Sequence, residues 1–277
     1  MNPEDLLVHV DGKDKVKIGG YMLPAEDFSL TRFMLQDLGM SWLHPGGIIS
    51  TIRLLEMLRL KSEMRVLDLG CGIGSTTRYI AKKFNCEVIG IDHNKDMIHQ
   101  AKDRTHGHRY HGISYHVMDG NNMAFPDCSF DRVIMQSVAC FNDKPRIFRE
   151  AVRVLKNGGV LGLNEVTWIQ PPTVTVERVT RSTICETFKG AILEKQWIET
   201  LEKSGLAEIN HQVFAFETMA PYQMLREEGL MNTARIMSRV LRNPEINIRL
   251  SAVSDYFKKY PGYFGYGIYT GCKPVTN

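Results

Sequence analysis

The stretch Met64-Arg65-Val66-Leu67-Asp68-Leu69-Gly70-Cys71-Gly72-Ile73-Gly74-Ser75 decides the fold of this 277-residue chain. Its apolar first half predicts a strand, three glycines follow at alternate positions, and a helix-compatible run begins at Ser75. Glycines at this spacing let the backbone turn sharply and approach a ligand, because no Cβ stands in the way. The helix N-terminus behind them offers unpaired N–H groups and a positive dipole end. The stretch therefore predicts a pocket for a nucleotide-type ligand.

Short apolar strands and amphipathic helices alternate after this stretch, which predicts a mostly parallel sheet covered by helices on both faces. Asn157-Gly158-Gly159 is a helix stop signal within this pattern. The predicted strands are 64–69, 87–91, 114–118, 132–136, 160–165, 211–216 and 263–272. The predicted helices are 26–39, 48–60, 75–84, 94–104, 144–155, 193–205 and a long helical stretch over 221–260.

The rest of the chain is expected to form a cap and a lid around this core. Residues 1–60 predict an N-terminal helical cap, with a weakly ordered lead-in over 1–20 that holds one short strand near 6–10. The core is predicted to span 61–216, a helical insertion or lid 217–262, and the final antiparallel strand 263–277. The methionines of the insertion suit an apolar lid, a plain packing face or the surface of a homodimer.

Composition excludes several classes of protein. Hydrophobic residues make up 43% and charged residues 23%, as in ordinary globular chains. A net charge of +3 without a dense Lys/Arg stripe argues against a nucleic-acid partner. The six scattered cysteines form no C-x-x-C pair and indicate free thiols in a reducing compartment. With no signal peptide and no 18-residue apolar run, we expect no membrane span and a cytoplasmic location.

Three features beside the glycines bear on which nucleotide is held. The spacing is G-x-G-x-G, whereas the dinucleotide fingerprint is G-x-G-x-x-G. Asp92 ends the second core strand, where a carboxylate can accept both ribose hydroxyls or simply cap the next helix. Asp119-Gly120 ends the third, where the carboxylate can accept an adenine amino group or belong to a plain turn.

Over residues 60–168 the sequence resembles the class I S-adenosylmethionine-dependent methyltransferases, and most closely the small-molecule branch with ubiquinone/menaquinone and phosphoethanolamine methyltransferases. Four motifs occur in order: 66–74, 90–97, 119–131 and 149–159. The resemblance implies a Rossmann-like, seven-stranded sheet with six parallel strands and the last one reversed. It also implies an enzyme that transfers the methyl group of S-adenosylmethionine to a small organic molecule and leaves S-adenosylhomocysteine. The acceptor atom, whether N, C, O or S, is not specified.

The resemblance assigns cofactor contacts residue by residue. It implies that the first motif surrounds the methionine part, that the second holds the ribose and flanks the adenine, and that the third follows the adenine edge. Gln136 would face the sulfonium, and the turn before residue 48 would close over the methionine end. The implied cofactor residues are Asp68, Gly70, Cys71, Gly72, Gly74, Asp92, His93, Met97, Asp119, Gly120, Asn121, Gln136, Gly46 and Gly47.

Methyl transfer mainly requires that nucleophile, methyl group and sulfur be aligned and water excluded. Phosphoethanolamine methyltransferases use a histidine in the loop after the fourth strand, and residues 136–143 hold none. That departure argues against carrying over their activity. The candidates for acceptor contact or base catalysis are Glu165, His44 and Tyr21, against the alternatives of helix capping and core packing. No histidine spacing predicts a metal site.

Rival functions stay open at this point. A nicotinamide-dependent oxidoreductase is disfavoured by the glycine spacing and the Asp119 motif. A non-catalytic S-adenosylmethionine-binding module is disfavoured because all four motifs are intact. An RNA or protein methyltransferase lacks support, since no N-P-P-Y-type tetrapeptide follows the fourth strand and no basic domain is appended.

Overall fold

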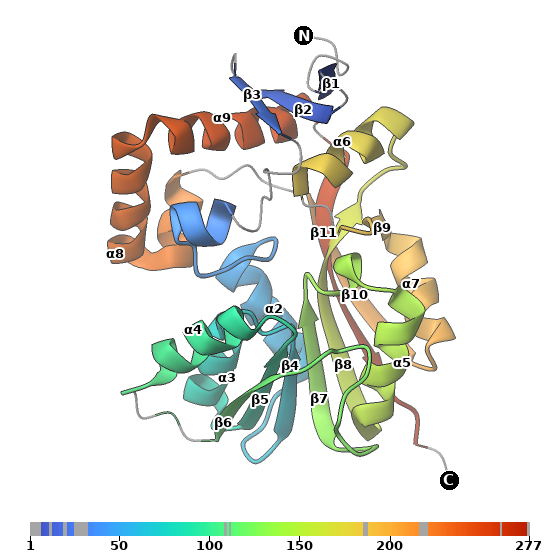
Figure 1. Cartoon of the computed structure of the whole chain (residues 1–277). Helices are drawn as coiled ribbons and strands as arrows, with labels where there is room; N and C mark the ends of the chain where they lie inside the picture. The colour runs from blue at the N-terminus through green and yellow to red at the C-terminus, as the bar shows by residue number, and fades with distance from the viewer. Residues whose placement is uncertain are drawn as a thin grey trace. The chain divides into compact units, whose positions relative to one another are not determined.

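The computed structural model describes residues 7–10, 13–18, 21–24, 33–107, 110, 112–184, 188–215, 221–260 and 262–275 (Figure 1). The chain forms two compact units. The first unit comprises Met1–Leu43, Trp168–Gly190 and Ala215–Gly265, and the second comprises His44–Thr167, Ala191–Phe214 and Tyr266–Asn277. This division differs from the expected cap, core and lid, because the segment 44–60 belongs with the core sheet and the segment 168–190 does not.

The second unit is built on a mostly parallel sheet with strand order β10-β11-β8-β7-β4-β5-β6, to which the short β9 adds by pairing with β8. β4 pairs in parallel with β5 and β7, β5 with β6, and β7 with β8. β11 runs against β8, since Gly158 N donates to Lys273 O and Ile169 N to Tyr263 O. The mostly parallel, Rossmann-like sheet is therefore confirmed. The strands are β4 (Arg65–Leu69), β5 (Glu87–Asp92), β6 (Ile113–Val117), β7 (Phe130–Gln136), β8 (Leu155–Trp168), β9 (Ile192–Leu193), β10 (Ala207–Ala215) and β11 (Phe264–Cys272).

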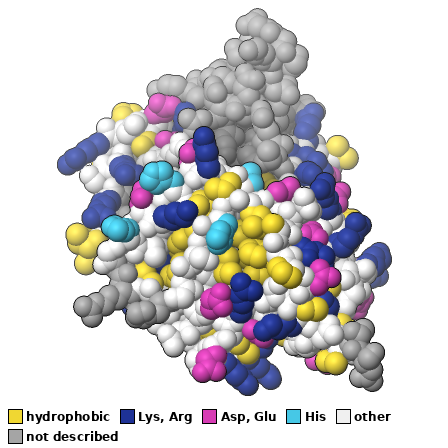
Figure 2. Space-filling view, turned by 60° about the horizontal axis from the view of Figure 1, so that its bottom comes forward, with side chains coloured by type: hydrophobic (Ala, Val, Ile, Leu, Met, Phe, Trp, Pro, Cys, Tyr) yellow, Lys and Arg dark blue, Asp and Glu magenta, His cyan; other side chains and the backbone are white. Residues whose placement is uncertain are grey.

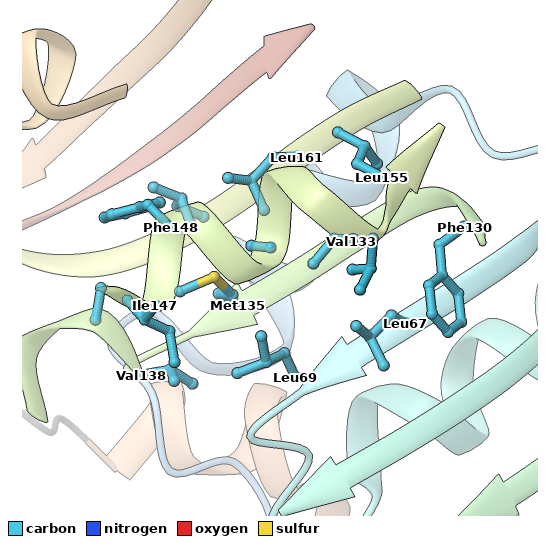
Figure 3. Close-up of a cluster of buried hydrophobic side chains, with 14 of the residues drawn as sticks. Leu67, Leu69, Phe130, Val133, Met135, Val138, Ile147, Phe148, Leu155 and Leu161 are labelled. Atoms are coloured by element: carbon cyan, nitrogen blue, oxygen red, sulfur yellow. The ribbon is translucent and has the colours of Figure 1, made fainter. Parts of the chain in front are cut away.

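Helices cover both faces of this sheet (Figure 1). Alternate residues of β4 point to opposite faces. Val66 packs in one cluster with Leu54 and Ile80, and Leu67 in the other with Phe148 (Figure 3). One face carries α2 (Gly47–Leu58), α3 (Ser75–Phe84) and α4 (Lys95–Thr105), and the other carries α5 (Lys144–Val154) and α7 (Glu194–Lys203). No described helix combines the length and apolar composition that a bilayer crossing requires.

The strand register brings the carboxyl ends of the parallel strands to one edge. Asp68 of β4 is opposite Gly90 of β5, Asp92 is opposite Val117 of β6, and Gln136 of β7 is opposite Asn164 of β8. The predicted site residues therefore follow one another along the edge at which doubly wound sheets bind ligands.

The first unit departs from the predicted helical cap. Three of its strands, β1 (Leu7–Val10), β2 (Lys13–Ile18) and β3 (Tyr21–Pro24), pair as an antiparallel sheet. The strand expected near 6–10 is β1, whereas β2 and β3 were not expected. Their sequence signal was available, because Asp-Gly separates the paired Val10 and Lys13, and Gly-Gly separates Ile18 and Tyr21. Two-residue connections of these types are strong hairpin signals.

The helices of the first unit also differ in detail from expectation. Of the helix predicted over 26–39, the described part is a π-helix, Phe33–Leu38, and residues 25–32 lie outside the described residues. The stretch predicted as helical over 221–260 is α8 (Pro221–Arg242) and α9 (Pro244–Lys259). They separate at Asn243, whose side chain caps α9 by accepting from two backbone N–H groups. The segment after Trp168 contains α6 (Val174–Ile184).

Candidate active site

The glycine loop after β4 folds over the end of β5. The N–H groups of Gly70 and Cys71 both donate to the Ile91 carbonyl, at 2.8 and 2.9 Å. Gly72 N then donates to Asp92 Oδ2 at 3.0 Å. The glycine loop and the acidic end of β5, which are two separate motifs in the sequence, are thus joined by hydrogen bonds.

The glycines of this loop are required for different reasons. A Cβ at Gly70 would collide with Val138, and one at Gly74 with the Tyr115 ring. At Gly72, where φ is +51°, a Cβ would meet no atom within 4 Å. Packing of the protein itself therefore explains two of the three glycines, while Gly72 leaves space beside the backbone. An adenosyl ligand that approaches the loop closely fits this arrangement.

Two helix N-termini of the second unit lack a side-chain cap. Gly74 precedes α3 with φ 76° and Gly46 precedes α2 with φ 73°, both in the left-handed conformation. Their first N–H groups and positive dipole ends are therefore not neutralised by a capping side chain. Such N-termini suit a carboxylate or another anion.

Asp92 has the geometry of a ribose ligand. Its side chain is 12% exposed, and its oxygens each accept one backbone N–H group, Oδ2 from Gly72 and Oδ1 from Asn94 at 2.9 Å. A carboxylate oxygen has two lone pairs, so one remains on each oxygen for a hydroxyl donor. His93, by contrast, has a largely exposed ring whose Nδ1 lies 3.6 Å from Asp92 Oδ1.

Asp68 is buried at the end of β4 and accepts a 2.6 Å hydrogen bond from the Thr77 hydroxyl on α3. Burial raises its pKa to about 6; the hydrogen bond from Thr77 opposes this shift, and the nearby Asp92 adds to it. Asp68 ties the sheet to the first turn of α3. Thr77 lies three residues after Gly74 and was not among the predicted site residues.

The turn after β6 is closed by its own side chains. Asp119 Oδ1 accepts from both the N–H group and the amide Nδ2 of Asn121, each at 2.9 Å, and these bonds lower the pKa of Asp119. Asn121 Nδ2 also donates to Asn142. Asn121 Oδ1 is buried without a hydrogen-bond partner among the described residues, so an acceptor remains at this turn. Gly120 packs against Leu69, and the N–H group of Met97, in α4, donates to the Asn94 side chain.

The end of β7 carries an uncharged, hydrogen-bonded group of side chains. Gln136 Nε2 donates to Thr76 at 2.7 Å, and Thr51 donates to Gln136 Oε1 at 3.0 Å. Thr51 also lies 3.1 Å from Nε2 of His44. Burial lowers the pKa of His44 to about 4, so the ring is neutral near pH 7. Gly47 is buried at the start of α2 in the same unit.

Glu165 is fully buried, and its oxygens accept the backbone N–H groups of Val138 and Ala139 at 2.8 Å and of Cys140 at 3.2 Å. Burial raises its pKa, and the three N–H donors oppose that rise. These contacts cap the 3-10 helix Ala139–Phe141 and hold the loop that follows β7. They favour a positioning role, while contact with an acceptor stays a prediction.

The structure also identifies contributors that the motifs did not indicate. Tyr115 packs against Gly74 and Gly90, and the amide of Asn164 donates to His44 Nδ1 and Pro45 O. Asn164 beside Glu165 was a readable signal, because polar residues are unusual in a central strand. Tyr21 lies in β3 of the first unit, and its side chain is outside the described residues. Within the described ranges, no three His, Cys, Asp or Glu side chains gather as a metal site.

Comparison with known proteins agrees with this geometry. Residues 66–159 match the family model of the methyltransferase domain. Phosphoethanolamine N-methyltransferase 1 of Arabidopsis thaliana is 36% identical over 122 residues, 44% of this chain and 25% of that protein. The chain thus matches only about a quarter of the length of this plant relative. Methyltransferase GfsG of Streptomyces halstedii is 25% identical over 216 residues, 72% of this chain and 77% of that protein.

The fold is shared with solved structures. Phosphoethanolamine N-methyltransferase 2 of Haemonchus contortus, in complex with phosphomonomethylethanolamine and S-adenosylhomocysteine, aligns with a TM-score of 0.70 at 22% identity. The alignment covers 92% of this chain and 62% of that one. A methyltransferase domain is supported by three observations: the family match, the order of the strands and the glycine loop joined to Asp92. Residues 66–159 are thus similar to the methyltransferase domain and to the matching part of proteins named as methyltransferases.

Proposed function

We propose that this chain transfers the methyl group of S-adenosylmethionine to a small organic molecule and leaves S-adenosylhomocysteine. The observation that carries the proposal is the Asp92 carboxylate, which the Gly72 and Asn94 N–H groups hold with a lone pair left on each oxygen. A ribose presents two adjacent hydroxyl donors, which such a carboxylate accepts together. The space beside Gly72 supports an adenosyl group at the same place.

The order of the strands supports one orientation of the cofactor. β4 lies between β7 and β5, and β6 is the outermost of these four strands. With the ribose on Asp92, the adenine would be held by Asp119 and Asn121 after β6. The methionine part would then extend past Asp68 toward Gln136 and the N-terminus of α2. In this assignment the methionine part, the ribose and the adenine follow one another in the same order as the strands β7, β4, β5 and β6.

When bound, S-adenosylmethionine would supply a methyl group on a positively charged sulfur. The acceptor's nucleophilic atom attacks the methyl carbon in line, and the sulfur leaves as the neutral thioether of S-adenosylhomocysteine. The protein's part is to hold the reactants aligned and to exclude water. Gln136, Thr51 and Thr76 are uncharged and hydrogen-bonded to one another, so they fix geometry without placing a charge at this end of the site.

A strong general base is not part of the proposal. His44 has a pKa of about 4 and is hydrogen-bonded through both ring nitrogens, and Glu165 is occupied by three N–H donors. We propose that the acceptor atom is already nucleophilic, as an amine or an enolate carbon is. Tyr21 stays a sequence-based candidate for acceptor contact. Glu165 acts through the loop that it holds.

The acceptor itself differs from that of the plant relatives in this proposal. Their names give phosphoethanolamine as their substrate, but this chain matches a quarter of their length and has no histidine over 136–143. We propose a small acceptor other than phosphoethanolamine. The test is to offer a panel of amines, enols and thiols, with phosphoethanolamine beside them, and to measure the S-adenosylhomocysteine that each acceptor releases.

The proposals for location and assembly rest on the cysteines, the surface charges and the methionines of α8. The described cysteines are free thiols, which supports a cytoplasmic location. Lys/Arg and Asp/Glu side chains are interspersed on the face shown in Figure 2, which supports a partner other than nucleic acid. A homodimer is proposed through the methionine-containing segment of α8, and light scattering of the full chain tests it.

Calorimetry separates the rival functions. S-adenosylhomocysteine should bind and NAD should not, because the glycine spacing is G-x-G-x-G rather than the dinucleotide G-x-G-x-x-G and because the Asp119 motif follows β6. Binding of NAD without either sulfur ligand would overturn the methyltransferase proposal. Tight cofactor binding without turnover of any acceptor in the panel would favour the non-catalytic binding module.

A further inference from the structure

A buried chain of hydrogen bonds at the end of β7 is not explained by the cofactor motifs. It joins Asn164, His44, Thr51, Gln136 and Thr76 in this order, and we call it the relay. Its distances are 3.0, 3.1, 3.0 and 2.7 Å, all within the normal range. The relay links β8, the turn before α2, α2 itself, β7 and the first turn of α3. All five residues belong to the second unit.

The direction of the relay follows from Asn164. Its Nδ2 lies 3.0 Å from the Pro45 carbonyl oxygen, which can only accept, so the amide is oriented with its amino group on this side. The same amino group lies 3.0 Å from His44 Nδ1, whereas the Pro45 carbonyl oxygen lies 3.4 Å from Nδ1, so we assign the shorter contact and infer that Nδ1 accepts and carries no proton. In a neutral imidazole the proton is then on Nε2, and Nε2–H donates to Thr51 Oγ1.

The remaining steps fix the Gln136 amide. With one lone pair of Thr51 Oγ1 occupied by His44, the Thr51 hydroxyl donates to Gln136 Oε1, and Gln136 Nε2 donates to Thr76. One Nε2 hydrogen of Gln136 is left. No residue in the described part of the chain accepts it, although Gln136 is half-buried. An unused donor in such a place is costly unless a ligand accepts from it.

We propose that the relay turns the Gln136 amide so that its remaining N–H group binds the carboxylate of the cofactor's methionine part. This inference rests on the proposed function, which places that part at β7. The uncapped N-terminus of α2 lies within about one helical turn of Thr51, and its N–H groups favour an anion at the same place. His44 and Thr51 are positioning residues, which act through Gln136.

Thr51→Val tests the relay, because it removes the hydroxyl and keeps the shape of the side chain. Thr51→Ser, which keeps the hydroxyl, is the matched control. The probes are S-adenosylhomocysteine and 5′-methylthioadenosine, which shares the adenosine but lacks the aminocarboxylate. We expect Thr51→Val to bind S-adenosylhomocysteine about tenfold more weakly, as for one lost hydrogen bond to a charged group. Its affinity for 5′-methylthioadenosine should be unchanged, and Thr51→Ser should match the wild type with both probes.

Asp92→Ala separates failure of this inference from failure of the proposed function. It should weaken both probes alike, and a wild-type chain that binds neither probe would remove the proposed function itself. If the wild type binds both but Thr51→Val weakens both equally, or neither, the relay inference is overturned. A second test needs neither a ligand nor a variant: the nitrogen NMR spectrum of His44 in the full wild-type chain. It should show the neutral Nε2–H tautomer, and the Nδ1–H tautomer would reverse the relay and refute the proposal.

Discussion

The two ends of the candidate site are built in opposite ways. At the β5–β6 end, Asp92 and Asp119 are ionisable and accept hydrogen bonds from residues two positions along the chain, Asn94 and Asn121. At the β7 end, Thr51 and Asn164 are buried, Gln136 is half-buried, and all three are uncharged. The Thr51–Gln136 contact joins residues 85 positions apart. Apart from the bond from Gly72 to Asp92, the first end consists of hydrogen bonds within short turns. The second exists only when the whole sheet has assembled.

This contrast predicts where substitutions are costly. A polar group that is exposed can exchange a lost partner for water, whereas a buried one is left with an unpaired donor or acceptor. Changes at the β7 end should therefore lower stability, and changes at the β5–β6 end should mainly lower ligand affinity.

The largest effect is expected for Glu165→Ala. Removal of this carboxylate leaves three buried N–H groups of residues 138–140 without their acceptor and opens a cavity. We expect the free energy of unfolding to fall by about 3–5 kcal/mol, measured by urea denaturation. Asp119→Ala is the control at the other end, where the exposed turn should lose no more than about 1.5 kcal/mol. Equal losses in the two variants would erase the contrast.

The two buried titratable groups predict opposite pH dependences. Asp68 has a pKa raised from 3.8 to about 6, so the folded state binds its proton more tightly and stability falls as pH rises from about 4 to 6. His44 has a pKa lowered from 6.5 to about 4, so the unfolded state binds its proton more tightly and stability rises over that range. Each shift corresponds to about 3 kcal/mol.

Asp68→Asn and His44→Gln uncover these two slopes. Relative to the wild type, Asp68→Asn should gain stability as pH rises from 4 to 6, because the unfavourable ionisation is gone. His44→Gln should lose relative stability over the same interval. Urea denaturation at several pH values measures both differences. Parallel curves for either variant would mean that the group is solvated in the folded protein.

Asp92→Ala should act on affinity rather than on folding. Its oxygens are the proposed acceptors of both ribose hydroxyls, so S-adenosylhomocysteine binding should weaken by about 1–3 kcal/mol. Calorimetry measures this change, and the unfolding midpoint should move less than that of Glu165→Ala. Unchanged affinity would show that the ribose lies elsewhere.

The sequence was informative where function depends on neighbours in the chain. The strand before Gly70, the carboxylate at position 92 and the turn at 119–121 could be predicted, because each is a local pattern with a fixed spacing. The relay could not be predicted, since nothing near Thr51 in the sequence indicates that Gln136 lies beside it. The same reason explains Glu165, whose role depends on three backbone groups about 25 residues earlier.

The first unit shows a different kind of limit. Residues 1–20 were expected to be a weakly ordered lead-in with one strand, although Asp-Gly at 11–12 and Gly-Gly at 19–20 are hairpin signals. Those signals are local, so β2 and β3 could have been predicted. The relay differs, because the local sequence holds no signal for it.

Gly72→Ala, for which we expect only a small loss of stability, tests whether the open side of the glycine loop faces the ligand. An alanine at φ +51° carries a strain of about 1–2 kcal/mol, and its Cβ meets no atom of the protein within 4 Å. If an adenosyl ligand occupies that space, the Cβ must displace it, so S-adenosylhomocysteine affinity should fall by more than the modest loss of stability. Gly74→Ala is the matched comparison, because its Cβ collides with Tyr115 and should unfold the loop from within. A Gly72→Ala chain with wild-type affinity would mean that the open side faces water, and the cofactor would then have to be placed on the Asp92 side alone.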